Sequence, residues 1–576
     1  MNESSGSFEV LSSRVDELEK RIHALEHPDE VKASAANEVA GAANAVSVAG
    51  ADSFQSANIF PLLGRAMLGI AGAYVLRALA EAGMAPKVMV AAAIAYAFAW
   101  LVWAARVSKA AGFAPLVYAA TSAVILVPML WEETLHFHIL SPSLTAIVLA
   151  AFAGLASAFG WRRKSFQPLW LAYCAAAAAA VALSVTTHAT SPFVVVLLVI
   201  VLLIESARVM GQARPVWPLI ALLGDASIWG TIFVYSGPPN TRAEYPELGV
   251  TTLVFPACLL FAINATSMAV RAILKEEKIG IFEIVQVMVA FGLAIYGLLA
   301  FVSGSATLIG VICLVLSAAG YFASLRLLRR RDQMRNFATF STWSAALLVA
   351  GAFWSLPQAG AGVLLSVAGL TAYAVALRID STMLEWHGAA FLCTGAATAG
   401  VAQYVFHALA SSLPGRPDFA VWIAAGAAIA AYAVGGDTKD EDWMRKGPRL
   451  VSALLAVTAV SAFLVHGVVA FAMLAVALDA HHIAFLRTLV VSAVSLCLAY
   501  VGPRLGRGAM TLMAYVTLAF IAAKLVFEDL RHGHMEFIAA SIFLFAVALI
   551  AVPRLVRIGA KSHPEAHVKT PVPIGS

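Results

Sequence analysis

Long apolar stretches alternate with short polar connections from Ile59 to Ile558, a pattern typical of membrane-spanning helices. A helix crosses the bilayer core, about 30 Å thick, in roughly 20 residues with its backbone hydrogen bonds closed internally. We therefore expect an all-α fold, a polytopic transmembrane bundle of about 18 helices, rather than a soluble helical protein. The expected helices cover residues 59–79, 88–105, 113–130, 140–160, 168–186, 193–210, 215–235, 249–270, 281–302, 305–325, 338–355, 359–377, 387–409, 418–434, 450–475, 486–501, 508–527 and 536–556.

The segments outside this bundle have a different composition. Residues 1–27 carry apolar side chains at alternating spacings of three and four, which predicts a cytoplasmic coiled-coil helix. It would pair with a second copy, a protein partner or the body of the protein; the alternative is a solvated amphipathic helix. Residues 28–58 form a flexible Ala/Ser-rich linker, and after the bundle (59–558) we expect a disordered cytoplasmic tail over 559–576. The apolar positions of the coiled coil are Phe8, Leu11, Val15, Leu18, Ile22 and Leu25.

Lys and Arg are distributed unevenly over the connections. Most of them fall in the even-numbered connections, such as the arginine cluster from Arg326 to Arg335, whereas the odd-numbered connections hold about five, among them Arg487. Cytoplasmic connections retain basic residues, so the even ones are expected to face the cytoplasm. Both termini then lie in the cytoplasm, and the protein is expected in a bacterial inner membrane.

The overall charge and the cysteines narrow the possible partners. The net charge of +5 comes mainly from these connections, and no basic patch is interleaved with aromatic residues, so we expect the lipid bilayer and no nucleic acid as a partner. The five cysteines each lie in a different expected helix without CxxC spacing, and they are interpreted as small apolar packing residues. No cofactor is predicted.

Polar residues inside the expected spans are costly in lipid and are therefore candidates for function. Asp225 lies in the middle of the seventh span, Arg65 and Lys524 lie near span ends, and Asn264 lies deeper. The simpler interpretation is interhelical hydrogen bonding or snorkelling of long side chains toward the interface. The alternative is an ion- or proton-coupled transporter in which Asp225 changes its charge.

Two distant outer turns, WEETLHFH at 131–138 and FEDLRHGH at 527–534, share the order aromatic, acid, acid, two residues, His, any residue, His. With the histidines after Asp479, they predict a cluster of His and acidic residues on the outer face. Imidazole and carboxylate bind zinc-like ions, and imidazole also changes charge near neutral pH, but ordinary interfacial residues explain the pattern as well. Whether a metal binds is left open. The candidates are Glu132, Glu133, His136, His138, His481, His482, Glu528, Asp529, His532 and His534.

The chain contains none of the GxSxG, HExxH, Walker A or Rossmann glycine motifs, so no catalytic residues are assigned. Three classes of function remain. The first is an envelope-associated scaffold that recruits partners through the N-terminal helix. The second is the transporter, and the third is a membrane-embedded envelope enzyme that uses the outer-face acids and histidines.

Two segments carry a resemblance to known sequences. The first span, LLGRAMLGIAGAYVLRALAEAG, and the closing segment, AAKLVFEDLRHGHMEFIAASIFLFAVALIAVPRL, follow an N-terminal coiled coil and a low-complexity linker. This arrangement resembles a family of large bacterial polytopic membrane proteins of unknown function. Lys524 and Asp529 stand where the family tends to show a Lys followed by an Asp near the last turn. The resemblance implies the same fold and location and names no activity.

Overall fold

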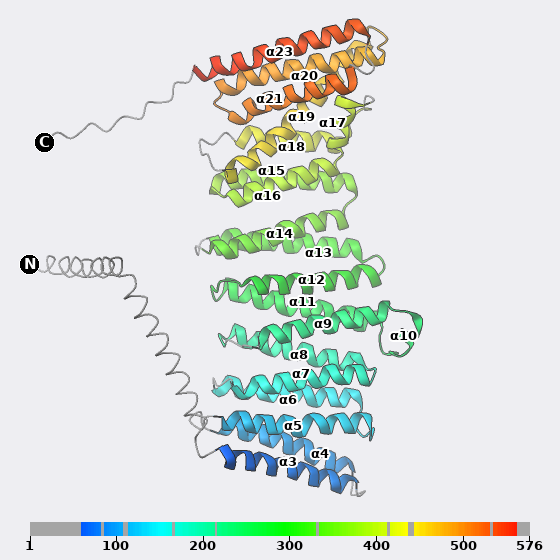
Figure 1. Ribbon diagram of the computed structural model, residues 1–576, viewed down its shortest axis with the longest axis vertical. Helices are drawn as coiled ribbons and strands as arrows, with labels where there is room; N and C mark the ends of the chain where they lie inside the picture. The colour runs from blue at the N-terminus through cyan, green and yellow to red at the C-terminus, as the bar shows by residue number, and fades with distance from the viewer. Residues whose placement is uncertain are drawn as a thin grey trace, which may run out of the picture. The chain divides into compact units, whose positions relative to one another are not determined.

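The computed structural model describes residues 59–81, 86–107, 113–163, 167–212, 216–329, 333–411, 415–435, 443–529 and 534–561. All of the regular structure in these residues is helical, with 20 α-helices and two π-helical segments and no strand (Figure 1), which confirms the all-α prediction. The expected coiled coil (1–27), the linker (28–58) and His532 lie outside the described residues. The last helix continues to Lys561, and the remainder of the expected tail, 562–576, also lies outside them.

The chain divides into two compact units, with the boundary inside α9. The N-terminal unit consists of α3 to α8, the first half of α9, and the short α10. In this unit α3, α4 and α5 pack against one another, α5 packs against α7, and α6 packs against α8. The bounds are α3 Ile59–Glu81, α4 Pro86–Arg106, α5 Ala114–Leu135, α6 Pro142–Arg163, α7 Gln167–Thr186, α8 Thr190–Val209, α9 Trp217–Ser236 and α10 Pro239–Ala243.

The C-terminal unit contains the second half of α9 and all later helices. Consecutive helices pair as hairpins, α11 with α12, α13 with α14 and α15 with α16, while α20 packs against both α21 and α23. The bounds are α11 Val250–Ile273, α12 Ile281–Phe301, α13 Ser305–Ala323, η2 Ser324–Leu328, α14 Met334–Ser355, α15 Gln358–Ile379, α16 Thr382–Thr398, α17 Val401–Ala410, α18 Phe419–Gly435, α19 Trp443–Met473, α20 Ala480–Arg504, α21 Gly508–Lys524, η4 Leu525–Asp529 and α23 Met535–Lys561.

Among the described residues, 15 helices are long and apolar enough to cross a membrane, and the bent pair of α16 and α17 raises this number to 16. Two shorter apolar helices, Trp170–Thr186 and Phe419–Gly435, coincide with the remaining two expected spans. The outward faces are apolar as well: Leu68 is 75% exposed and Phe543 67%. Such surfaces are unfavourable in water and suit lipid. The protein is therefore a multi-pass integral membrane protein.

The structure differs from the sequence prediction in one span. The expected helix over 387–409 is interrupted at Ala399 and Gly400, where α16 and α17 meet at an angle of 66°. Gly400 adopts a left-handed backbone conformation with φ of 85°. Residues that carry a Cβ atom rarely adopt this conformation, because the Cβ atom clashes with the backbone. Hydropathy does not detect this break, because the residues on both sides of it are equally apolar.

Several helices begin earlier or end later than expected. α20 begins at Ala480 rather than 486, so His481 and His482 lie in its first turn instead of in a connection. Glu132 and Glu133 lie in the last turn of α5. These corrections have a common reason: polar residues end an apolar stretch without ending the helix, since the backbone bonds continue into the interface.

Candidate functional site

The ends of α20 and α21 carry five interacting polar side chains, which we call the charge cluster: Arg487, Thr488, Lys524, Glu528 and Asp529. The first two lie in α20, two turns after its start, and Lys524 is the last residue of α21. Glu528 and Asp529 follow in the π-helical segment η4. Helices α20, α21 and α23 lie side by side (Figure 1), so residues about 40 positions apart in the sequence meet here. π-Helical turns are rare and are frequent at functional sites.

The ammonium group of Lys524 is surrounded by oxygen atoms. Its side chain is only 2% exposed, and the Asp529 carboxylate beside it is 4% exposed. The group donates to a carboxylate, a backbone carbonyl and a hydroxyl, which satisfies its three protons. Its distances are 2.7 Å to Asp529 Oδ1, 2.9 Å to the Ala484 carbonyl oxygen, 3.0 Å to Thr488 Oγ1 and 3.3 Å to Glu528 Oε2.

Arg487 links the charge cluster to the broken span. Its Nη1 lies 2.8 Å from Glu528 Oε1, and its Nε donates to the Ala408 carbonyl at 2.8 Å. Its Nη2 donates to the carbonyls of His407, at 3.1 Å, and Ser411. The His407 and Ala408 carbonyls lie in the last turn of α17, and Ser411 is its C-cap residue; the His407 carbonyl also accepts the Ser411 N–H, while helix ends leave carbonyls without partners inside the helix. The guanidinium therefore caps this half-helix.

The formal charges of the cluster cancel, because two cations, Arg487 and Lys524, face two carboxylates, Glu528 and Asp529. Thr488 Oγ1 donates to Asp529 Oδ2 at 2.9 Å and holds this carboxylate in place. The Glu528 side chain is 23% exposed and connects the buried cluster to the surface. The arrangement is thus a neutral, mostly buried set of charges with one edge open.

α17, the half-helix that follows the break, packs against α19 through a tyrosine and a histidine. Tyr404 Oη and His466 Nδ1 are buried and have no hydrogen-bond partner among the described residues. Their rings lie 5.9 Å apart, and the Tyr404 ring also lies 5.1 Å from that of Phe463. Discontinuous spans with polar groups at the break are a recurring feature of transporter binding sites.

Three outer-face candidates, His481, His482 and His534, lie together beside the charge cluster. The His481 ring centroid is 4.5 Å from that of His482 and 4.4 Å from that of His534, which precedes α23. With Lys524, Glu528 and Asp529, these histidines make six predicted residues that the C-terminal unit gathers at neighbouring ends of its helices.

The other outer-face candidates belong to the N-terminal unit. Glu132 forms an ion pair of 2.7 Å with Arg77, and both line a cavity of about 140 Å³ together with Glu133. Glu133 is 7% exposed, and its Oε2 has no hydrogen-bond partner among the described residues. His138 Nδ1 lies 3.2 Å from the Thr134 carbonyl, and the His136 ring packs edge-on against its neighbour in sequence, Phe137.

The intramembrane candidates have different surroundings. Arg65 Nη1 donates to Tyr118 Oη at 3.3 Å, in a pocket of about 370 Å³ lined mainly by aromatic rings. Asn264 Nδ2 donates to the Leu260 carbonyl one turn earlier at 3.0 Å, which is a local helix contact. Asp225 is 7% exposed near the centre of α9 and lines neither of the two cavities described above.

Sequence reasoning missed the role of two arginines. Arg487 is expected in a connection and Arg449 directly precedes the expected helix 450–475, but both lie inside helices and are 4% and 7% exposed. Arg449 Nη2 lies 3.3 Å from Glu385 Oε1, also at a buried position. For Arg487 a signal was present in the sequence, since the apolar run AFLRTLVVSAV continues on both sides of it.

No protein-family profile matches the chain, and neither curated proteins nor solved structures yield a match.

Proposed function

We propose that this multi-pass membrane protein is a cation/proton exchanger of a bacterial inner membrane, with the exchange site at Lys524. The observation that carries the proposal is the shell of four oxygen atoms, at 2.7 to 3.3 Å, around a buried ammonium group. Carboxylate, carbonyl and hydroxyl oxygens are also the ligands that replace the hydration shell of a metal cation. Lys524 thus occupies a position that a monovalent cation of similar size would fit.

The charge balance of the cluster predicts that one proton is exchanged for one monovalent cation. With Lys524 protonated, the two positive and two negative charges cancel. Without the positive charge of Lys524 the cluster has a net charge of −1, which one monovalent cation bound in the oxygen shell would neutralise. Binding of the proton and of the cation is then mutually exclusive, since both use the Asp529 and Glu528 oxygens. One proton leaves for each cation that enters.

The neighbouring broken span supports the same proposal. In many transporters the C-terminal ends of half-helices, where carbonyls are unsatisfied, help to bind the coupling cation. Here the C-terminal carbonyls of α17 hold the Arg487 guanidinium, whose other end contacts Glu528. Movement of α17 would therefore alter the environment of Glu528 and, through it, of Lys524. In this proposal Asp529 is the coupling residue, and the alternative at Asp225 is decided by the transport test. The scaffold hypothesis depends on residues 1–27, outside the described residues.

The test uses the purified full-length protein in proteoliposomes with an imposed pH gradient, followed with a fluorescent amine dye. Addition of NaCl, KCl or LiCl is expected to dissipate the gradient in wild-type vesicles and not in vesicles with Asp529→Asn. Asp225→Asn is the matched control, a buried aspartate outside the cluster, and is expected to retain exchange. Wild-type vesicles that respond like protein-free vesicles to all three salts would overturn the proposal. If Asp225→Asn abolishes exchange and Asp529→Asn does not, the exchange site lies in α9 instead.

A milder pair of variants separates a role in binding from a role in folding. Thr488→Val removes one oxygen from the shell, and Thr488→Ser retains it. Since one such contact contributes about 1 kcal/mol, Thr488→Val is expected to raise the apparent KM for the cation about fivefold, with the Ser variant close to wild type. Equal KM values for the two variants would exclude the Thr488 hydroxyl as a ligand.

A further inference from the structure

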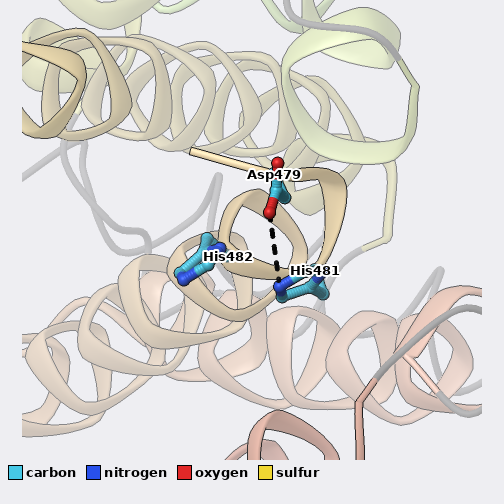
Figure 2. A group of neighbouring side chains, drawn as sticks. All are labelled: Asp479, His481 and His482. Carbon is cyan, nitrogen blue, oxygen red and sulfur yellow. Dashed lines mark ion pairs between the residues drawn. The ribbon is translucent and has the colours of Figure 1, made fainter. Parts of the chain in front are cut away.

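At the start of α20, a carboxylate and two imidazoles lie close enough to bind one ion. Asp479 directly precedes the helix, and His481 and His482 lie in its first turn (Figure 2). Asp479 Oδ2 lies 3.9 Å from His481 Nε2, and one ligand atom from each of the three residues lies within 4.8 Å of the others. We infer that these residues bind a divalent transition-metal ion of the Zn²⁺ class.

The donor set determines this class of metal. Two imidazole nitrogens and one carboxylate oxygen match the three protein ligands of many zinc sites, whereas Mg²⁺ and Ca²⁺ prefer oxygen ligands alone. With metal–ligand bonds of about 2.1 Å, ligand atoms in a tetrahedral shell are about 3.4 Å apart. The observed ligand atoms, 3.9 Å apart for Asp479 and His481 and at most 4.8 Å apart overall, therefore need to approach one another by about 0.5 to 1.4 Å around an ion. Asp479 can make this adjustment, because its side chain is 75% exposed and forms no capping hydrogen bond.

The surroundings of His482 provide an independent observation. Its Nδ1 is buried and has no hydrogen-bond partner among the described residues. Buried polar atoms of native proteins are normally satisfied, and an unsatisfied imidazole nitrogen at the edge of a ligand group is a position where an ion or its bound water would bind. The Phe537 ring packs against the His482 ring, with the two centroids 4.7 Å apart.

A further histidine, His534, lies near this group but is not one of the three residues whose ligand atoms come together. The His534 ring precedes α23 and lies 4.4 Å from the His481 ring. Helices α20 and α23 both pack against η4, the segment on which Glu528 and Asp529 lie. The positive end of the α20 dipole opposes a cation here, but its effective charge of about half a unit is smaller than the full negative charge of Asp479.

The site shares no residue with the charge cluster, so it is tested by binding and does not depend on the proposed exchange. The purified full-length protein, carrying an affinity tag without histidines, is titrated with Zn²⁺ in competition with a chromophoric chelator. We expect one Zn²⁺ per chain. Since loss of a single supporting contact weakens metal sites about 10- to 100-fold, His481→Ala/His482→Ala is expected to lower affinity more than about 100-fold, and Asp479→Asn about 10-fold.

The matched control is His136→Ala/His138→Ala, which removes an equal number of histidines from the N-terminal unit and is expected to leave the affinity unchanged. Wild-type protein without stoichiometric Zn²⁺, or an equal loss in the control variant, would overturn the inference. If the double variant does not fold, two other measurements test whether the metal site exists. Wild-type protein should show the visible absorption of tetrahedral Co²⁺, and Zn²⁺ should raise its unfolding temperature but not that of His482→Gln.

Discussion

Arg487 Nε donates to the Ala408 carbonyl oxygen at 2.8 Å, so a side chain of α20 satisfies the end of α17, 79 residues earlier in the chain. The last four carbonyls of an α-helix lack hydrogen-bond partners within the helix. In lipid no water is present to form these hydrogen bonds instead. The same guanidinium contacts Glu528 on η4. One buried arginine therefore fixes the relative positions of three elements of the C-terminal unit.

Replacement of this arginine is expected to destabilise the protein strongly. Arg487→Gln keeps part of the side-chain volume but removes the charge, leaving carbonyls of α17 and the Glu528 carboxylate without their cationic partner. Loss of one partner of a buried ion pair typically costs about 3–5 kcal/mol. The measurement is the free energy of unfolding in detergent micelles, titrated with sodium dodecyl sulfate.

The control for this prediction is Arg445→Gln. Arg445 forms a similar pair with Asp380 at 3.1 Å, but the two side chains are 33% and 79% exposed. Exposed pairs contribute about 0–1 kcal/mol, so the control variant should stay close to wild type. Equal losses for the two arginines would show that Arg487 does not act through its buried contacts.

The contact between α15 and α16 depends on glycine. A Cβ atom on Gly362 would lie 2.5 Å from the Ala399 backbone nitrogen and 2.7 Å from its Cα, and backbone cannot move as a side chain can. Gly362→Ala is therefore expected to separate the two helices and to cost about 1–3 kcal/mol. The change in unfolding temperature of the purified protein measures this effect.

Gly426→Ala in α18 is the matched control, because a Cβ atom there meets nothing within 4 Å. Alanine favours the helix over glycine by about 1 kcal/mol in water, so this variant should be neutral or slightly more stable. An unchanged unfolding temperature for Gly362→Ala would mean that α15 and α16 are not in such close contact.

The membrane-spanning helices were predictable from the sequence because the bilayer imposes one requirement on all of them, a run of about 20 apolar residues. All eighteen expected stretches coincide with helices or, for 387–409, with a helix pair. What hydropathy could not give was the interruption at Gly400, since a change in backbone direction leaves the apolar character unaltered.

The partners of the buried ion pairs could not be predicted from the sequence either. Arg449 contacts Glu385, 64 residues away, and Arg487 contacts Glu528, 41 residues away. The partner of a charged residue depends on which helices pack together, and local sequence patterns do not indicate this. In the sequence a charged residue therefore indicates the end of a span, although a buried partner allows the helix to continue through it. The clustering of His481 with His534 has the same origin, because α20 and α23 pack together.

The orientation in the membrane remains a prediction from the basic residues, and labelling can check it. In a cysteine-free variant, Glu244→Cys after α10 and Lys275→Cys after α11 are treated with a membrane-impermeant maleimide on intact spheroplasts. Because basic connections face the cytoplasm, Glu244→Cys should react directly and Lys275→Cys only after permeabilisation. The opposite pattern would invert the topology and place the charge cluster on the cytoplasmic side.

Lys524 and Asp529 are expected to depend on each other energetically. Asp529→Leu leaves a buried ammonium with one anion fewer, and Lys524→Met leaves a buried carboxylate without its nearest cation. Each single variant should lose about 3–5 kcal/mol. The double variant removes both charges, and the remaining pair, Arg487 with Glu528, is still neutral.

The double variant should therefore lose less than the sum of the single losses, by about 0.5–3 kcal/mol, the range found for directly contacting residues. Unfolding free energies of the four proteins, measured in the same micelles, give this coupling. Additive losses would mean that the 2.7 Å contact contributes no direct interaction to stability. A positive coupling would show that the ammonium and this carboxylate stabilise the protein through their direct contact.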